Sequence, residues 1–347
     1  MALSHNKQLY DISTRLAVYV EGVKADQTAQ FDKILNRSNE AIGKLLWRVK
    51  YDTLDGLSKA QLNKLIVDLR KAQSKIYSAY TSKLIAMLRE FMHVDLTVNR
   101  RVWVDSALSL EDYYEPSEEI PSDDEAIEYI ENEGDSKQSL LGLTAITGVA
   151  GSVGTGRLWH TINNKPIPAN GMTIDAFVRN FTLSAQARIE NEFRKAWVNQ
   201  LTVKQLQDEL LSRSAQGTSS QMARIHNQSR AVIHSVIAEV HNTVTSGVSS
   251  ALFRRYQWRS MMDDKTTAIC KSRNLKIYVY GEGPLPPAHV NCRSHIVPLD
   301  NGEPYQVDES MVMWAKGQPQ RVRNDMSMDR PMTLDRFANS VNILLWR

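Results

Sequence analysis

An apolar stripe between Leu62 and Leu88 restricts the possible folds of this 347-residue chain more than any other feature. Its residues recur at spacings of mostly three, four or seven, and no proline interrupts them, which is typical of one face of a long helix. A helix with one apolar face is stable in water only when that face is buried. The stripe therefore predicts a helical hairpin or bundle, and it comprises Leu62, Leu65, Leu69, Ile76, Tyr80, Leu84, Met87 and Leu88.

The surface that covers this stripe belongs either to the same chain or to a partner protein. Residues 9–23 and 31–51 also have helical character, and Ser58 with Gln61 has the form of a capping box just before the stripe. We therefore predict that residues 1–110 form a helical docking arm. Four of its residues contact either sister helices or a partner: Leu62, Leu69, Ile76 and Tyr80.

The middle of the chain divides into a linker and a second helical segment. Between Glu111 and Asp135 there are twelve acidic residues and no lysine or arginine, which is typical of an extended, exposed segment. Glycine-rich sequence follows up to Gly156, without the Gly-Lys-Ser/Thr ending of a phosphate-binding loop. We predict an acidic and then glycine-rich linker at 111–157 and a helical segment at 158–255.

From position 256 the pattern becomes that of a small mixed module. Short β-prone pieces at 276–280 and 294–299 alternate with proline and glycine turns, as in an irregular α+β unit. We predict this module at 256–300 and a C-terminal extension at 301–347. The predicted fold class is mainly α: an elongated helical N-terminal region with a small irregular α+β C-terminal module.

Charge and hydropathy limit the environments in which the chain is expected. Twelve of its 39 acidic residues lie in the acidic segment, so the remainder has 27 acidic against 42 basic residues. A basic body fits DNA or an acidic protein surface as a partner. No apolar run approaches the roughly 18 residues of a membrane span. The N-terminus lacks an apolar signal core, and two cysteines are too few for a secreted disulfide scaffold, so we expect synthesis in a reducing cytosol.

Three histidines lie on the helix predicted at about 219–253: His226, His234 and His241. Their gaps of eight and seven residues correspond to roughly 12 and 10 Å along a helix. These distances are too long for a shared metal ion. We predict packing or polar-surface roles for all three.

Both cysteines of the chain lie in the predicted module, together with a histidine. His289 and Cys292 are close in sequence, and Cys270 lies upstream of them. Thiolate and imidazole are preferred zinc ligands, and a structural zinc site has four ligands. Asp264 is our first candidate for the fourth, with Asp263 and His295 as others. Two alternatives stay open, namely free thiols in a hydrogen-bonded turn and a disulfide formed outside the cytosol. The cofactor is therefore either structural zinc or none.

No arrangement of residues indicates catalysis. Cys270 and His289 have the groups of a thiolate–imidazolium pair. However, the chain has no Gly-x-Ser-x-Gly motif and no oxyanion motif to accompany them. The adjacent Asp263 and Asp264 diverge on most backbones and make no obvious acid/base pair. We therefore predict that the chain is not an enzyme.

An ordered set of aromatic, cysteine, proline and histidine residues runs through positions 256–293. It comprises Tyr256, Trp258, Asp264, Thr267, Cys270, Pro286, Pro287, His289, Asn291, Cys292 and Arg293. This order resembles the C-terminal domain of the Mu F-like phage head morphogenesis proteins, also called minor head or minor capsid proteins. In that family a Tyr-x-Trp entry and an Asp-x-x-Thr element precede a closing Pro-Pro-x-His-x-Asn-Cys-Arg-Cys. The helix with Glu239, Asn242 and Gly247 is also similar to the family's helical approach.

The chain departs from the family pattern at Thr267 and Ser294, where cysteines can occur. The loss reduces a four-ligand set to three. If three ligands are too few for zinc, hydrogen bonds and packing hold the turn instead. The candidate residues for these contacts are Asp264, Asn291 and Arg293, because a partly buried Asp–Arg pair is a strong charge-assisted bridge.

The resemblance implies a structural role in a tailed bacteriophage. Proteins of this family are packaged in small numbers in the head, associate with the portal, and assist head assembly, DNA packaging or DNA ejection. For this chain the resemblance implies a place in the host cytoplasm during assembly and then inside the virion head near the portal vertex. The implied partners are the portal protein, packaged DNA and other head proteins, with several copies of the chain per head.

Two alternative functions remain. The first is a zinc-stapled nucleic-acid-binding module, for which Arg254, Arg255 and Arg259 beside Trp258 are the candidate contacts. The second is a toxin-type enzyme fused to a head domain. That reading requires a β-rich domain with an Arg…Ser…Glu site, which the sequence does not show.

Overall fold

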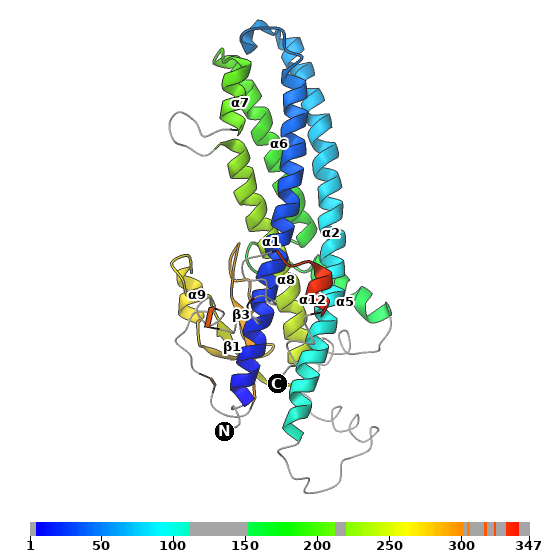
Figure 1. The fold of residues 1–347 in the computed structure, drawn as a ribbon, viewed down its shortest axis with the longest axis vertical. Coiled ribbons are helices and arrows are strands. Elements are labelled where there is room, and N and C mark those ends of the chain that lie inside the picture. Colours follow the sequence, from blue (N-terminus) through cyan, green and yellow to red (C-terminus); the bar gives the residue numbers. More distant parts are fainter. Residues whose placement is uncertain are drawn as a thin grey trace.

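The computed structural model of the protein describes residues 5–111, 152–211, 220–300, 304–305, 316–317, 323 and 331–339. Two long helices, α1 (His5–Leu46) and α2 (Lys59–Glu111), form an antiparallel pair along the long axis of the molecule (Figure 1). A short 3-10 helix, η1 (Leu54–Gly56), lies between them. This pair confirms the helical hairpin that the apolar stripe predicts.

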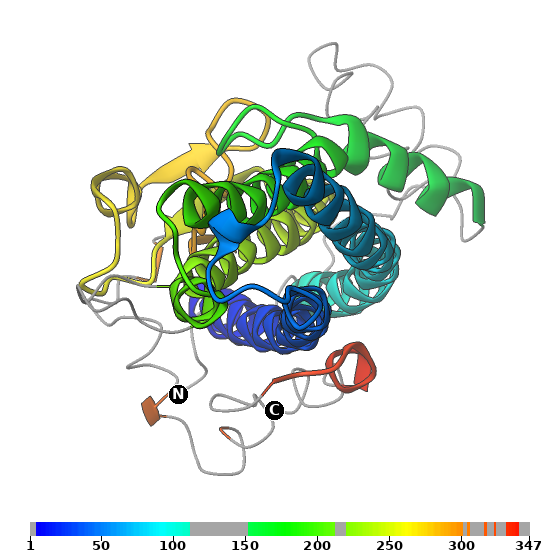
Figure 2. The same ribbon diagram turned by 90° about the horizontal axis from the view of Figure 1, so that it is seen from above.

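Three further helices complete a bundle around this pair: α6 (Ile174–Val198), α7 (Val203–Leu211) and α8 (Gln221–Ser249). Helix α8 packs against both α1 and α2, and α6 packs against α2 and α8. Figure 2 shows these helices around a common interior. Apolar side chains from every helix fill it, including the fully buried Phe31, Leu69 and Ile233. Removing this apolar surface from water is the main term that holds the bundle together.

The predicted helix starts are present in the structure. The Ser58 hydroxyl accepts from the Gln61 N–H at 3.3 Å, and the Ser58 N–H donates to the Gln61 side chain at 2.8 Å. Thr202 and Gln205 make the same reciprocal pair at 3.1 and 2.8 Å. Each capping box satisfies two donors that a helix start leaves unpaired, and the box predicted at Ser58 is thereby confirmed.

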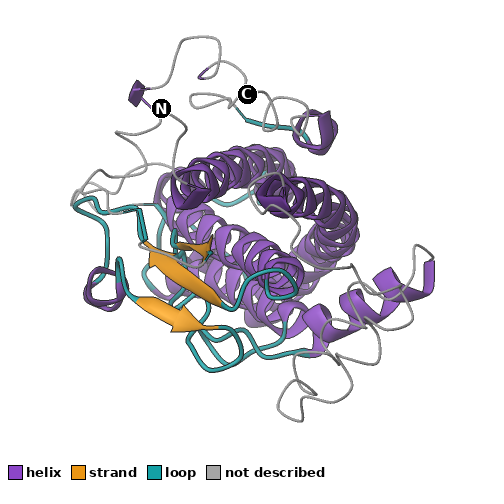
Figure 3. Ribbon diagram, turned by 90° about the horizontal axis from the view of Figure 1, so that it is seen from below, coloured by secondary structure: helices purple, strands orange, loops and turns teal. Residues whose placement is uncertain are grey.

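The C-terminal module contains a three-stranded antiparallel sheet on one flank of the bundle (Figure 3). Its elements are β1 (Arg255–Arg259), α9 (Ala268–Arg273), β2 (Ile277–Val279) and β3 (His295–Leu299). The strand order is β2-β1-β3, and Trp258 lies opposite Ile296. The fold class predicted from the sequence, mainly α with a small α+β module, is thereby confirmed.

Polar contacts fix this module against the first half of α1 and against α8. Strand β3 packs on both helices. The Arg259 guanidinium lies over the Tyr10 ring, with its central carbon 4.9 Å from the ring centroid. This is a cation–π geometry. At the end of β3, the Asp300 N–H donates to Asn6 at 3.0 Å. The module is therefore built on the bundle surface and shares its helices.

Several predicted boundaries were wrong. Helix α1 is continuous where the periodicity predicted two segments, and the helical segments 1–110 and 158–255 form one bundle. Helix α5 (Ser152–Asn164) begins inside the predicted linker, whose residues 112–151 lie outside the described part of the chain. In the predicted extension, α12 (Leu334–Asn339) packs on α1 and α2.

Candidate metal centre

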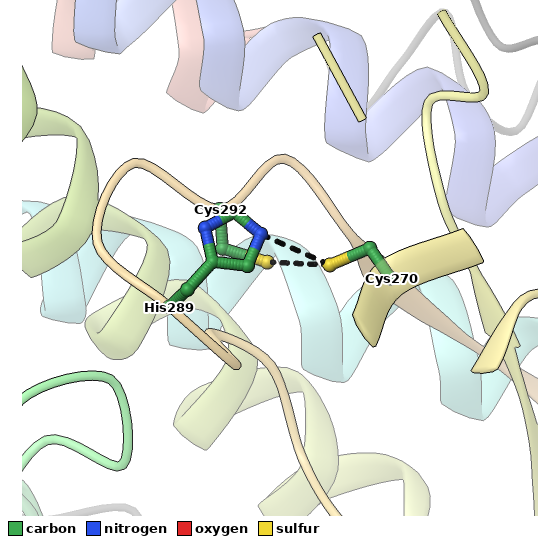
Figure 4. A group of neighbouring side chains, drawn as sticks. All are labelled: Cys270, His289 and Cys292. Atoms are coloured by element: carbon green, nitrogen blue, oxygen red, sulfur yellow. Dashed lines mark hydrogen bonds between the residues drawn. The ribbon is translucent and has the colours of Figure 1, made fainter. Parts of the chain in front are cut away.

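Cys270, His289 and Cys292 converge in the module (Figure 4). Cys270 lies on α9, and the other two residues lie on the loop before β3. The Cys270 Sγ is 3.1 Å from the His289 Nε2 and 3.7 Å from the Cys292 Sγ. Both cysteines are buried, and no disulfide joins them. The donor atoms of all three side chains lie within 4.8 Å of one another.

The Ser260 hydroxyl holds the segments that carry this cluster together. It donates to the Cys270 carbonyl at 2.9 Å and accepts from the Trp258 indole at 3.0 Å. It also lies 3.0 Å from the Ser294 hydroxyl. One buried side chain thus links β1, α9 and the start of β3. Trp258 itself is fully buried and packs in the same small cluster as the two cysteines.

The other motif residues shape the loop that carries His289 and Cys292. Pro287 follows Pro286 through a cis peptide bond. Asn291 has a φ of 61°, a conformation that asparagine tolerates better than most residues. Its N–H donates to the Ser235 hydroxyl of α8 at 2.7 Å. The loop is therefore fixed both internally and to the bundle.

The His289 ring is oriented as in a metal ligand. Its Nδ1 lies 2.9 Å from the Val290 carbonyl, which can only accept a hydrogen bond. Nδ1 therefore carries a proton, and Nε2 faces the Cys270 sulfur. Histidine ligands of metals typically donate their second ring N–H in this way.

Electrostatics favour one thiolate in the cluster. The hydrogen bond with Cys270 lowers the pKa of Cys292 to about 3, against the effect of burial and with help from His289 and backbone N–H groups. The hydrogen bond with Cys292 raises the pKa of His289. The same neighbour, together with burial, raises the pKa of Cys270. These shifts favour the thiolate form of Cys292, which is the form in which cysteine binds a metal cation.

The donor separations fit zinc. Zinc–sulfur bonds of about 2.3 Å at a tetrahedral angle place two sulfurs about 3.8 Å apart. The two Sγ atoms are 3.7 Å apart. The sulfur–nitrogen distance of 3.1 Å is a little shorter than the roughly 3.5 Å of such a site. A possible Cys-His-Cys metal group is therefore present, and the residues fit the ion.

The predicted fourth ligand does not join this group. Asp264 is exposed. Among the described residues, the metal group consists of Cys270, His289 and Cys292 only. The neighbouring Asp263 instead forms a two-point ion pair with Arg293 at 2.6 and 2.7 Å. The predicted Asp–Arg bridge thus exists, but through Asp263 and not Asp264. His295 is buried on β3 and also lies outside the metal group.

The arginines proposed for nucleic-acid contact do not form one surface. Arg259 is buried against Tyr10, and Trp258 is fully buried. Arg255 is partly buried and donates to the Asp300 carbonyl at 3.4 Å, whereas Arg254 is exposed. Because buried groups cannot reach a phosphate backbone, the proposal of a shared arginine site beside Trp258 was wrong.

The stripe on α2 contacts sister helices. Leu62, Leu69 and Tyr80 are buried, and Ile76 is partly buried against the same core. The Tyr80 ring packs edge-on against the Phe31 ring of α1, and the two ring centroids are 4.7 Å apart. Of the two alternatives for these four residues, the structure therefore supports packing against sister helices, so they do not form a partner-binding surface.

A buried polar chain at the centre of the bundle was missed by sequence reasoning. The Asp95 carboxylate lies 3.1 Å from the His241 Nδ1 and accepts from Asn99 at 2.9 Å. Asn99 in turn accepts from the Trp103 indole at 2.8 Å. The spacing of four between these α2 residues was the signal from which the sequence could have revealed this chain.

The α8 histidines occupy packing and polar-surface positions, as the sequence predicts. His226 lies 3.1 Å from Asp32, and His234 is buried.

No protein-family model, curated protein or solved structure matches the chain. Within the described ranges, no helix has both the length and the apolar character that crossing a bilayer requires.

Proposed function

We propose that the chain is a structural minor head protein of a tailed bacteriophage, associated with the portal inside the head. One observation carries the proposal. Trp258, Cys270 and Cys292, three of the residues on which the sequence resemblance rests, meet in one buried cluster although up to 34 positions separate them in the chain. A motif whose members build a single structural unit supports a family resemblance better than scattered matches would.

The rest of the fold agrees with an assembly role. A long helical bundle offers an extended surface for docking on a larger assembly. The buried ionisable residues Asp95 and His241 are paired with each other deep in the core, where a substrate cannot reach them. We therefore propose a structural role and not a catalytic one.

Within this function, the Cys-His-Cys group is proposed to hold a zinc ion that staples the module. When bound, zinc supplies bonds between α9 and the loop before β3, which a small module with little apolar core lacks. The test is the zinc content of the purified chain. We expect one zinc per chain, lost in Cys292→Ser and kept in the control His226→Ala, whose side chain lies on the bundle surface. A zinc-free wild-type chain would contradict the staple.

The portal association is tested by co-expression with the portal protein of the same phage. We expect a stable complex that survives moderate salt and has a defined native mass. If the portal purifies alone while the chain binds DNA with a steep salt dependence, the portal proposal fails and the nucleic-acid-binding function is favoured.

A further inference from the structure

Two hydroxyl groups complete the surroundings of the Cys-His-Cys group. The Ser294 hydroxyl lies 3.0 Å from the Ser260 hydroxyl, which donates to the Cys270 carbonyl at 2.9 Å. Thr267 is three residues before Cys270, in the N-cap position of α9, and its side chain makes no capping hydrogen bond. Hydrogen bonds of both side chains with Cys270 also oppose the rise of the Cys270 pKa.

The three strong ligands leave one position of a tetrahedral ion without a protein donor. Zinc is four-coordinate in nearly all protein sites, and a site with three protein ligands takes water or another small molecule as the fourth. Among the described residues, no further histidine, cysteine or carboxylate joins the group. The hydroxyl side chains of Ser294 and Thr267 belong to the segments that carry the ligands, the first next to β3 and the second at the start of α9. Neutral hydroxyls are weak zinc ligands but good partners for a bound water.

The cluster is not sealed inside the protein. Cys270, Cys292 and Ser294 are buried, whereas Thr267 is exposed and His289 is partly exposed. Two of the side chains at the cluster therefore contact solvent.

We propose that the fourth ligand of the bound metal is a solvent oxygen held by the Thr267 and Ser294 hydroxyls, so that this coordination position exchanges with small external ligands. The inference rests on the proposed zinc staple. It distinguishes the centre from a closed structural site, in which four protein ligands exclude solvent.

Cobalt(II) in place of zinc provides the test, because its visible absorption depends on the ligands and each thiolate adds a near-ultraviolet charge-transfer band. The full chain is loaded with cobalt in a phosphine reductant and titrated with azide and with 2-mercaptoethanol. We expect azide to change the visible bands. We expect the external thiol, as a third thiolate beside two, to raise the charge-transfer absorbance about 1.5-fold.

Two variants close the fourth position from within the chain. Ser294→Cys and Thr267→Cys each place a thiol beside Cys270, the first at the buried side and the second at the exposed side. Each is expected to raise the charge-transfer absorbance without external thiol, to abolish the azide response, and to tighten zinc binding about 10-fold or more. Because Thr267 is exposed, its variant remains informative if Ser294→Cys does not fold.

Ser272→Cys is the matched control, since it adds a thiol on an exposed position of the same helix. It should keep the wild-type spectrum and azide response. A wild-type chain that binds cobalt but ignores both azide and thiol would overturn the open position while leaving the staple intact. A wild-type chain that binds no cobalt or zinc would overturn the staple itself.

Discussion

His234 lies in the interior between α8 and α1, and its pKa is lowered to about 3. Burial is the main cause, Lys24, Arg230 and Arg293 contribute to the lowering, and Glu21 opposes it. The folded protein therefore keeps this ring neutral, whereas the unfolded chain protonates it near the ordinary pKa of about 6.5. The stability that results is complete above pH 6.5 and is lost as the pH falls toward 3.

His234→Gln is expected to remove part of this acid sensitivity. A glutamine keeps a polar side chain of similar length but binds no proton. The change in melting temperature between pH 7 and pH 4.5 should therefore be smaller in the variant than in the wild type. His226→Gln is the control, because that ring is about one-third exposed beside Asp32. Equal pH dependence in wild type and His234→Gln would contradict this account.

The adjacent aspartates show what residue spacing can and cannot predict. Cysteine and histidine in the module were recognisable from the sequence because few residue types bind zinc. The choice between Asp263 and Asp264 was not, since it depends on local backbone geometry. Asp263 accepts from the Lys265 N–H at 3.1 Å and from the Thr266 hydroxyl at 3.0 Å. This turn directs its carboxylate toward Arg293, whereas Asp264 is left exposed.

At the scale of elements, α1 contains two glycines in different surroundings. A Cβ at Gly22 would lie 2.8 Å from the Met332 Cβ, whereas a Cβ at Gly43 would meet nothing within 4 Å. Gly22 also accepts a hydrogen bond from the Met332 N–H at 3.0 Å. The close approach at Gly22 is therefore what lets the segment with α12 lie against α1.

Alanine at these two glycines should have opposite effects. Gly43→Ala is expected to raise the free energy of unfolding by about 0.5–1 kcal/mol, because alanine is the better helix former. Gly22→Ala gains the same propensity but must displace Met332, so it should be neutral or destabilising and should expose residues 331–339 to protease. Denaturant unfolding and limited proteolysis measure both effects. Equal stabilisation by the two substitutions would show that the segment does not pack tightly there.

Helix α1 is continuous, and a polar stretch in its middle explains why its two halves were predicted as separate segments. Between Lys24 and Gln30 the residues are mostly polar, so the apolar periodicity is lost. In the structure Lys24 is nonetheless buried and pairs with Glu21 at 2.6 Å, near His234. The burial of Lys24 has no signature in one sequence, because the elements that cover it are distant in the chain. Helix starts were more predictable, since a capping box is local.

At the scale of the whole molecule, bundle and module share their supporting helices. Helix α2 packs against α1, α6 and α8, while β3 packs against α1 and α8. If the bundle opened, the module would lose the helices on which it packs, and we expect it to unfold as well. The sequence could show the two regions but not this dependence, because it arises from contacts such as Arg259 with Tyr10, far apart in the chain.

Leu69→Ala tests this dependence. Leu69 is fully buried on α2, away from the module, and its truncation should cost about 2–5 kcal/mol. If the molecule unfolds as one unit, hydrogen exchange in β1 and β3 must accelerate together with exchange in α2. Val67→Ala, at a position 58% exposed on the same helix, should leave both unchanged. Faster exchange in α2 with undiminished protection in the strands would mean that the module is stable alone. The proposed portal binding and the proposed metal binding could then be tested on separate parts of the chain.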